Sequence, residues 1–204
     1  MEKMISFNIS YSAWSLYRQS QLQFYYTYIA KEKITDAVPQ VYGIAGNVVH
    51  NAIEKFLVDG KDHFDGLWDD SGADNMIGMN DLPVSRTSYR KMYDTAITYL
   101  MMLSDDIPIG SMEKELRIEL KYGDMKIKGF FDVCIPGIDL ILDWKTNSRY
   151  SYEMHRDQRL FYAWLYYMAY KRIPTCRWIY LRGNGSRKGI QEDTFTQEQI
   201  LEFG

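Results

Sequence analysis

The feature that most constrains the fold is a run of three apolar segments between residues 113 and 145, separated by two short turns. Apolar and charged residues alternate in 113–120, which is typical of a half-buried strand. The turn sequences Tyr122-Gly-Asp124 and Pro136-Gly137 bound the next segments, 125–135 and 138–145. Because connections this short join neighbouring antiparallel strands, the sequence predicts a three-stranded antiparallel meander.

Helices are predicted on both sides of this meander. Helical periodicity marks residues 10–30, with Ser12 as the N-cap, then 43–58, 84–103 and 152–171. The acidic, Gly-rich stretch 59–83 is expected to be a surface loop, and 175–181 a further strand. The order predicts an α/β fold whose central mixed sheet, a meander plus an added strand, is flanked by helices. We expect one domain over 1–204, with a helical segment at 10–104 and an α/β core at 112–204.

Charge is distributed unevenly along a chain whose formal net charge is −3. Residues 145–188 contain ten basic and two acidic residues, a net charge of +8, whereas residues 1–144 carry −7 and 189–204 carry −4. A basic segment of this kind can hold a polyanion near one face. The alternative is a solvated basic helix surface.

The composition also predicts the compartment. The two cysteines, Cys134 and Cys176, lie in apolar contexts and are interpreted as buried thiols of a reducing compartment. The N-terminus lacks the layout of a secretory signal, and polar residues interrupt every apolar run before it could cross a membrane. We therefore expect a cytoplasmic protein with no membrane partner.

Two acids and a lysine occur at the ends of the apolar segments. Asp132 lies near the end of the second segment, and Asp143 and Lys145 lie at the end of the third. Because side chains at i and i+2 of a strand point to the same face, Asp143 and Lys145 would share a site, with Trp144 turned away. Two carboxylates and an ammonium group suit a divalent-cation phosphodiesterase, although an isolated Asp-x-Lys is more often a solvated pair.

An upstream histidine is the remaining candidate ligand. His50 lies on the predicted helix 43–58 and shares a face with Glu54 at i, i+4. An isolated histidine on such a helix is more often a core or surface residue. Only a family resemblance, carried by the motifs that follow, implies a role for His50 as a ligand of Mg²⁺ or Mn²⁺.

These residues belong to an ordered set of motifs: Gly129-Phe-Phe-Asp132, Asp143-Trp-Lys145-Thr146 and Gln158-x-x-x-Tyr162. The set resembles the PD-(D/E)XK nuclease superfamily and, within it, the RecB-type exonuclease branch. The segments around Ser10 and Gly46-x-x-x-His50 are similar as well, so the resemblance covers residues 10–182. It implies a restriction-endonuclease-like core and a metal-dependent DNA nuclease, expected to be an exonuclease.

The resemblance implies a role for each residue. The metal ligands would be His50, Asp132, Asp143 and the backbone carbonyl of Trp144. The catalytic residues would be Asp132, Asp143 and Lys145, with the lysine orienting the attacking water or stabilising developing charge. DNA contacts would come from Gln158, Tyr162, Arg149, Arg156 and Arg159. Glu115, which lies in the first strand, is a candidate additional acid.

Many relatives carry four cysteines for an iron–sulfur cluster, but this chain has two, so no cluster is expected. The resemblance further implies DNA with free ends or single-stranded regions as a partner. Protein partners in a phage or bacterial recombination and repair assembly, or further copies of the chain, would fit the same branch. Two alternatives stay open: a catalytically weak DNA-binding or assembly module, and a metal phosphoesterase that acts on a small molecule.

Overall fold

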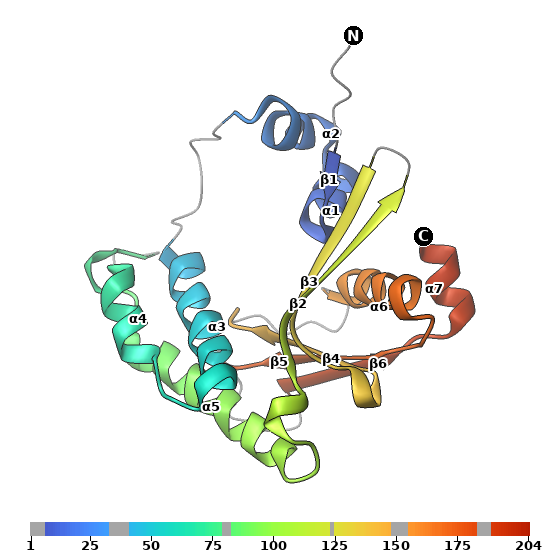
Figure 1. The fold of residues 1–204 in the computed structure, drawn as a ribbon. Coiled ribbons are helices and arrows are strands. Elements are labelled where there is room, and N and C mark those ends of the chain that lie inside the picture. Colours follow the sequence, from blue (N-terminus) through green and yellow to red (C-terminus); the bar gives the residue numbers. More distant parts are fainter. Residues whose placement is uncertain (1–6, 33–40, 79–82, 123–124, 148–154, 183–188) are drawn as a thin grey trace.

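A mixed six-stranded sheet lies at the centre of the protein (Figure 1). The computed structural model describes residues 7–32, 41–78, 83–122, 125–147, 155–182 and 189–204. The strands are β1 Phe7–Ile9, β2 Glu113–Tyr122, β3 Met125–Ile135, β4 Leu140–Lys145, β5 Thr175–Tyr180 and β6 Ile190–Thr194. The predicted α/β fold with a mixed sheet flanked by helices is therefore confirmed.

The sheet contains the predicted meander and one strand that the sequence pattern did not indicate. Strands β2, β3 and β4 pair antiparallel in sequence order, and β5 joins β4 in parallel. β6 pairs antiparallel with β5 at the far edge. The unexpected strand is β1, which pairs in parallel with the first residues of β3. With three residues, β1 is too short to show a hydrophobic period.

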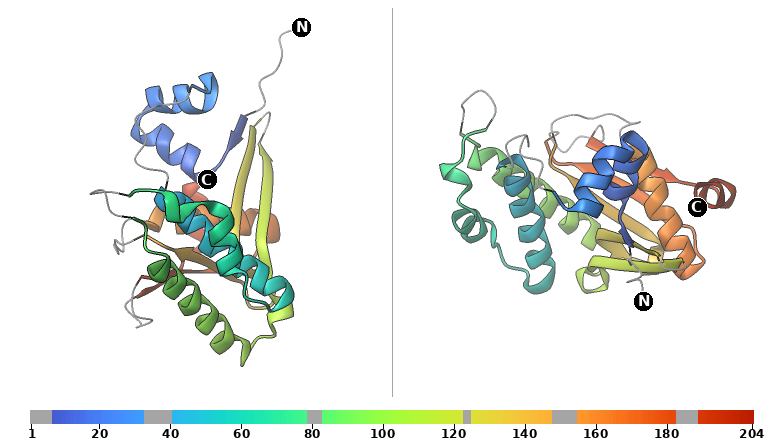
Figure 2. Two further views of the ribbon diagram at one scale, coloured as in Figure 1. Left: turned by 90° about the vertical axis from the view of Figure 1, so that its left-hand side faces the viewer. Right: turned by 90° about the horizontal axis from the view of Figure 1, so that it is seen from above.

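Helices cover both faces of the sheet (Figures 1 and 2). α3 Val41–Asp59, α4 Phe64–Ser71 and α5 Arg86–Ser104 lie on one side. α6 Arg156–Tyr170 lies on the other, beside α1 Tyr11–Gln19 and α7 Gln197–Phe203. The remaining helical segments are α2 Gln21–Phe24, the π-helix η1 Tyr25–Ala30, and the 3₁₀ turns η2 Ala73–Asn75, η4 Ile109–Ser111 and η5 Pro136–Ile138.

Two hydrophobic cores result, one on each face, and β4 contributes to both. Leu142 and Trp144 pack in the core against α3 and α5, whereas Ile141 packs in the core beneath α6. Because side chains alternate along a strand, Asp143 and Lys145 lie on the face that α6 covers. Trp144 is turned the opposite way, as the spacing predicted. Among the described residues, no helix is long and apolar enough to cross a membrane.

The single helix predicted over 10–30 is divided into α1, α2 and η1. Its first helix begins after Ser10, whose Oγ accepts a hydrogen bond from Ala13 N at 3.3 Å, so Ser12 is not the N-cap. The helix ends at Ser20, where the backbone is extended, and Ser20 Oγ caps α2 by accepting from Gln23 N at 3.2 Å. Serine hydroxyls compete with the helical hydrogen-bond ladder in this way, which explains why one continuous helix over 10–30 was a wrong prediction.

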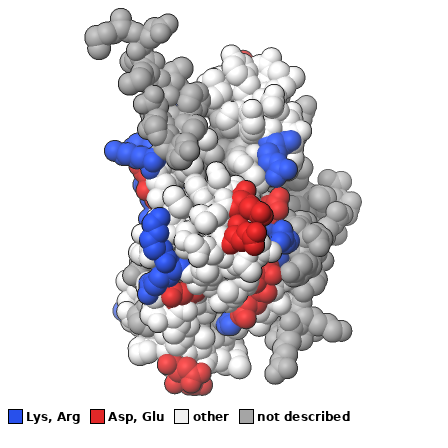
Figure 3. All heavy atoms as spheres, turned by 90° about the vertical axis from the view of Figure 1, so that its right-hand side faces the viewer, with Lys and Arg blue, Asp and Glu red and all other residues white. Residues whose placement is uncertain are grey.

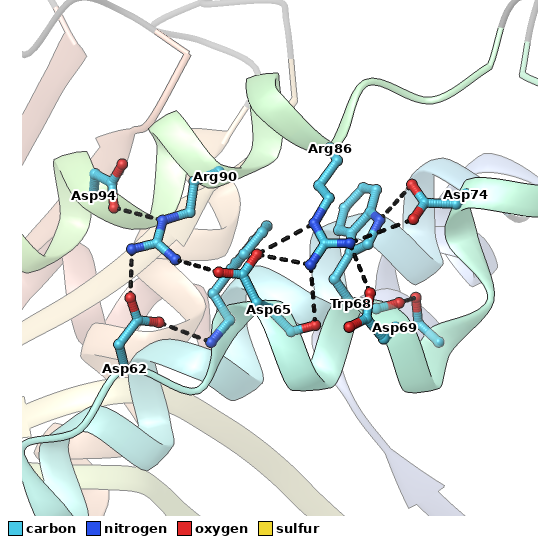
Figure 4. A network of polar contacts seen from close by, with 10 residues as sticks. Asp62, Asp65, Trp68, Asp69, Asp74, Arg86, Arg90 and Asp94 are labelled. Atoms are coloured by element: carbon cyan, nitrogen blue, oxygen red, sulfur yellow. Dashed lines mark hydrogen bonds and ion pairs between the residues drawn. The ribbon is translucent and has the colours of Figure 1, made fainter.

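The prediction of a surface loop over 59–83 was also wrong, because this stretch contains α4. The aspartates that suggested a solvated loop pair with two arginines of α5 (Figure 4). Arg86 lies 2.6 Å from Asp69, and Arg90 lies 3.0 Å from Asp65. Beneath these ion pairs Trp68 is fully buried. The acidic residues thus attach α4 to α5, and the energy of the attachment comes mainly from the buried ring.

We expect Trp68→Ala to lower the free energy of unfolding by about 3–5 kcal/mol, since it removes a fully buried ring and leaves a cavity. Urea unfolding followed by circular dichroism measures the change. Asp70→Ala, an exposed position on the same helix, should shift stability by less than about 0.5 kcal/mol. Equal stability of the two variants would contradict the burial of Trp68.

Candidate active site

The site lies where β3 and β4 separate. The ladder between them runs from Ile135 opposite Leu140 to Val133 opposite Leu142 and goes no further. Beyond it, Asp132 Oδ2 accepts a hydrogen bond from the backbone N–H of Trp144 at 2.8 Å. The carboxylate of Asp132 thus takes the position of a strand partner, which holds it beside the end of β4.

Two glycines allow helices from both faces to approach this point. A Cβ atom at Gly46 of α3 would lie 2.9 Å from Thr146 Oγ1, directly after β4. A Cβ atom at Gly129 of β3 would lie 2.4 Å from Leu165 Cδ1 of α6. Each glycine lies within four residues of a candidate ligand, His50 or Asp132, in the same element. The missing side chains therefore determine how closely α3 and α6 approach the site.

His50 and Asp132 form the first of two ion pairs, with His50 Nδ1 3.2 Å from Asp132 Oδ2. Burial by itself would lower the pKa of His50, but the adjacent carboxylate outweighs it and raises that pKa. Burial would raise the pKa of Asp132, and His50 together with the Trp144 N–H lowers it below the usual range. Both shifts favour an imidazolium–carboxylate pair.

Asp143 and Lys145 form the second pair, with Lys145 Nζ 2.5 Å from Asp143 Oδ1. Asp143 is 5% exposed, and burial raises the pKa of its carboxyl to about 6, against the opposing effect of the lysine. A carboxyl that titrates near neutrality in a buried position is typical of functional sites. The predicted shared face of Asp143 and Lys145 is thus present in the structure.

Gln158 at the start of α6 fixes the position of the lysine. Its Oε1 accepts hydrogen bonds from Lys145 Nζ at 3.0 Å and from Trp178 Nε1 at 3.4 Å. Its Nε2 donates to Tyr162 OH at 3.3 Å. Because Tyr162 is buried, it positions Gln158 from one helical turn away, and we do not expect it to touch DNA. The side chains of Lys145, Gln158 and Tyr162 form one hydrogen-bonded chain.

A small cavity of about 70 Å³ opens next to the first ion pair and is lined by His50, Asn51, Ile53, Glu54, Asp132 and Trp144. A cavity of this volume has room for a few water molecules or a partly hydrated ion. Among the described residues, no three His, Cys, Asp or Glu side chains converge closely enough to hold a metal ion. His50, Asp132 and Asp143 are neighbours, but each pairs with another side chain of the protein.

Two residues at the site were missed or given no role from the sequence. Glu54 lines the cavity one helical turn after His50, and their i, i+4 spacing was the signal that could have indicated it. Trp178 of β5 pairs in register with Asp143, and Lys145 Nζ lies 5.5 Å from the centre of its indole ring. No local sequence feature indicates Trp178, because its role depends on the parallel pairing of β4 with β5.

The arginines predicted to contact DNA lie in different environments. Arg159 is 0% exposed and donates hydrogen bonds to the carboxylate of Asp193 and to Gln191 Oε1, so its prediction as a phosphate contact was wrong. Arg156 is half-buried at the start of α6, with its guanidinium 5.7 Å from the centre of the Phe195 ring. Arg149 and the side chain of Glu115 lie outside the described residues.

In the described parts of the basic segment, 145–147 and 155–182, the cations do not gather on one face. Arg156 and Lys171 lie at opposite ends of α6, and Arg177 forms an ion pair with Glu192 of the neighbouring strand. Figure 3 shows basic and acidic groups side by side on the surface nearest the C-terminus. Folding thus separates charges that are close in sequence, and the expected single basic face is not found among the described residues.

The fold and the motif set define a class of phosphodiester-cleaving enzymes. A family model of the PD-(D/E)XK nuclease superfamily matches residues 8–200, so the chain belongs to that superfamily. Its members generally use divalent metal ions and act on nucleic acids. No curated protein matches the chain.

Two solved structures are similar to the chain to different degrees. A crystal structure of a candidate exonuclease from Eubacterium rectale is 11% identical and has a TM-score of 0.51, with 97% of this chain and 76% of that chain covered. The structure of the protein SSO0001, also 11% identical, covers 78% of this chain and 70% of its own with a TM-score of 0.35. Only the first is similar enough to support the restriction-endonuclease-like core.

Proposed function

We propose that this protein is a divalent-metal-dependent DNA nuclease that hydrolyses phosphodiester bonds and acts as an exonuclease. One observation carries the proposal: His50, Asp132, Asp143 and Lys145 lie together just beyond the point where β3 and β4 stop pairing. These four residues come from one helix and two strands. Asp132 Oδ2 also accepts a hydrogen bond from the backbone N–H of Trp144. Two carboxylates, an imidazole and an amine are the groups that phosphodiester hydrolysis with a hard cation requires.

The donor set at the cavity fits a hard divalent ion. His50, Asp132, Asp143 and the carbonyl of Trp144 would hold Mg²⁺ or Mn²⁺, and Glu54 lines the same cavity. When bound, such an ion supplies charge neutralisation at the phosphoryl oxygens and makes water more acidic. Asp143 is not among the residues that line the cavity, so for all three side chains to act as ligands it would have to exchange Lys145 for the ion, and His50 would have to exchange Asp132.

Lys145 is the group we expect to act on the reacting phosphate. Its ammonium group would orient the attacking water or stabilise the negative charge that develops on the phosphoryl oxygens. Gln158 holds Nζ from the opposite side at 3.0 Å, so the lysine stays in place when Asp143 turns away. Tyr162 and Trp178 keep the Gln158 amide oriented. Arg156 remains a proposed phosphate contact.

Exonuclease action and the RecB-type branch are supported by two observations. The Gly129-Phe-Phe-Asp132 motif is similar to that branch, and the Eubacterium rectale protein with the same fold is described as a candidate exonuclease. Both cysteines are buried free thiols, Cys134 in β3 and Cys176 in β5, and the proposal includes no iron–sulfur cluster. DNA with free ends is the proposed partner, within a recombination or repair assembly.

One observation favours the alternative, a DNA-binding or assembly module with little catalysis. At the candidate site, Asp143 pairs with Lys145 and His50 pairs with Asp132. The described side chains therefore form no cluster of three metal ligands there. In such a module the pairs would be structural. Metal binding separates the alternatives, because a purely structural pair gains nothing from a divalent ion.

Incubation with end-labelled linear DNA and with circular DNA of the same sequence, in Mg²⁺ or Mn²⁺, tests the proposal. An exonuclease releases labelled mononucleotides or short fragments from the linear form, leaves the circle intact, and stops when EDTA removes the ion. Cleavage of the circular DNA would show that the protein is an endonuclease. Failure to cleave either DNA in both ions would favour the binding module.

We also expect metal binding to strengthen steeply with pH. Asp143, with its pKa raised to about 6, and His50, with its pKa raised by Asp132, both carry protons at low pH that the ion must displace. Mn²⁺ affinity should therefore rise about 100-fold between about pH 5 and about pH 8, with release of protons. Isothermal titration in buffers of different ionisation enthalpy measures both quantities.

In His50→Gln, Mn²⁺ binding should release about one proton fewer and its affinity should rise less steeply with pH, since one of the two titrating groups is gone. His63→Gln is the matched control, because His63 pairs with Asp59, 2.8 Å away, outside the cavity. An unchanged slope in His50→Gln would remove His50 from the ligand set.

A further inference from the structure

The segment Gln21–Ala30, which comprises α2 and η1, projects from the body of the protein (Figures 1 and 2). We call it the aromatic arm. None of its residues is buried, and Leu22, Tyr25 and Tyr26 are 67%, 52% and 39% exposed. A helical piece this short with no buried face is not stable by itself in water. Clustered exposed apolar side chains of this kind mark an interaction site.

The aromatic rings of the arm form two groups. Phe24 lies between Tyr17 of α1 and Tyr28, with ring centres 5.3 Å from each. Tyr25 and Tyr26 meet edge to face at 5.6 Å and are the more exposed pair. The second half of the arm is a π-helix, a rare conformation that occurs frequently at functional sites. The arm therefore presents ring faces to solvent in place of packing them in a core.

Charge indicates what the arm binds. Residues 7–31 contain no Asp or Glu, in a chain with 27 acidic residues, and the cations there are Arg18 and Lys31. The arm itself has no charged residue, and the nearest acids are Glu32, whose N–H donates to Tyr26 O at 3.0 Å, and Asp157, which pairs with Arg18. Exposed rings without charges of their own suit single-stranded nucleic acid, because its unpaired bases stack on aromatic rings. In duplex DNA the bases are already stacked on one another and cannot reach the rings.

The arm begins at the edge of the candidate active site. Arg18, at the end of α1, lies 3.9 Å from Asp157 of α6. The next residue, Gln158, accepts the hydrogen bond from Lys145. After the arm the chain continues into α3, which carries His50. Along the chain the arm therefore lies between α1, whose last turn contacts α6 next to Gln158, and α3, which carries His50.

We propose that the aromatic arm stacks unpaired bases of the DNA strand whose phosphodiester lies at Lys145, so that the enzyme prefers single-stranded ends. This inference rests on the proposed nuclease function for its substrate. It adds a base-binding surface, centred on Tyr25 and Tyr26, to the site that holds the phosphate. Stacking does not depend on base identity, and the preference should extend over all sequences.

The test measures binding of the full chain, in EDTA, to a fluorescent oligo-dT strand of about 20 nucleotides and to a duplex of the same length. The double variant Tyr25→Ala/Tyr26→Ala should weaken binding of the single strand about 10-fold or more and leave duplex binding within about 2-fold. Tyr25→Phe/Tyr26→Phe keeps the rings and should bind like the parent. Tyr170→Ala is the matched control, with 40% exposure at the far end of α6.

Salt dependence and oligomeric state complete the test. Stacking predicts that the double alanine variant loses the same factor at every salt concentration, with an unchanged slope. Equal single-strand affinity of parent and variant would overturn the inference. So would sedimentation showing that the arm joins two copies of the chain while single-strand binding is unaffected.

Because EDTA prevents hydrolysis, this result does not depend on catalysis. If the parent binds the single strand through the arm but cleaves no DNA with Mg²⁺ or Mn²⁺, the nuclease proposal fails and the arm inference stands. If the parent cleaves DNA and the double alanine variant binds and cleaves the single strand equally well, the arm inference fails by itself.

Discussion

Lys145→Met should lower the rate of DNA cleavage by about 1,000-fold at saturating metal. The substitution removes the ammonium group that we expect beside the reacting phosphate and keeps most of the length of the side chain, and charge stabilisation in a buried site contributes about 10²–10³ to rate. Asp143→Asn should cause a comparable loss, because it replaces a charged oxygen ligand with a neutral amide. Release of end label from linear DNA measures both rates.

The two variants should differ in metal binding. Asp143→Asn removes a proposed ligand and should weaken Mn²⁺ binding, whereas Lys145→Met frees Asp143 from its 2.5 Å contact and should bind the ion at least as well as the parent. Lys126→Met is the control, since Lys126 pairs with Glu119 at 3.1 Å near the other end of β3. Full activity in Lys145→Met would remove this lysine from the mechanism.

Arg159→Met should lower the free energy of unfolding by about 1.5–3 kcal/mol, the usual contribution of a hydrogen bond to a charged group. Arg159 is 0% exposed, and its guanidinium donates to the Asp193 carboxylate and to Gln191 Oε1 at 2.8 Å. Without it, the carboxylate loses its cation and Gln191 loses a donor. Urea unfolding of parent and variant measures the difference.

A second substitution makes this prediction specific. Asp193→Leu in the Arg159→Met background should restore much of the stability, because apolar groups of similar size then replace both partners of the ion pair. At temperatures where Arg159→Met is folded, its DNA affinity should equal that of the parent, whereas Arg156→Met should bind DNA more weakly. A reduced DNA affinity of folded Arg159→Met would show that Arg159 contributes to DNA binding.

The meander and the candidate site were predictable because each depends on local patterns. Alternation of apolar residues over 113–145 indicated the strands, and the i, i+2 rule put Asp143 and Lys145 on one face. The spacing of Gln158 and Tyr162 likewise put them on one side of α6, where they form a hydrogen bond. These features need only the period of a strand or helix.

The errors concern residues whose environment depends on distant segments. The aspartates of 59–75 look solvated until Arg86 and Arg90 of α5 are placed opposite them. The sequence pattern suggested that Arg159 is an exposed cation of α6. In the structure it pairs with Asp193 of β6. In both cases a charged residue is paired by a partner more than 15 positions away, and periodicity carries no information about such partners.

The antiparallel meander, the shared face of Asp143 and Lys145, and the absence of acids from 7–31 follow from the sequence by itself. Tertiary structure alone decided that Asp132 accepts a hydrogen bond from Trp144 N–H, that Trp178 donates to Gln158, and that Arg159 is buried against Asp193. The physical reason is that alternation and helical period are properties of neighbouring residues. Ion pairs and buried hydrogen bonds, in contrast, form between segments that only the packed sheet and its helices bring together.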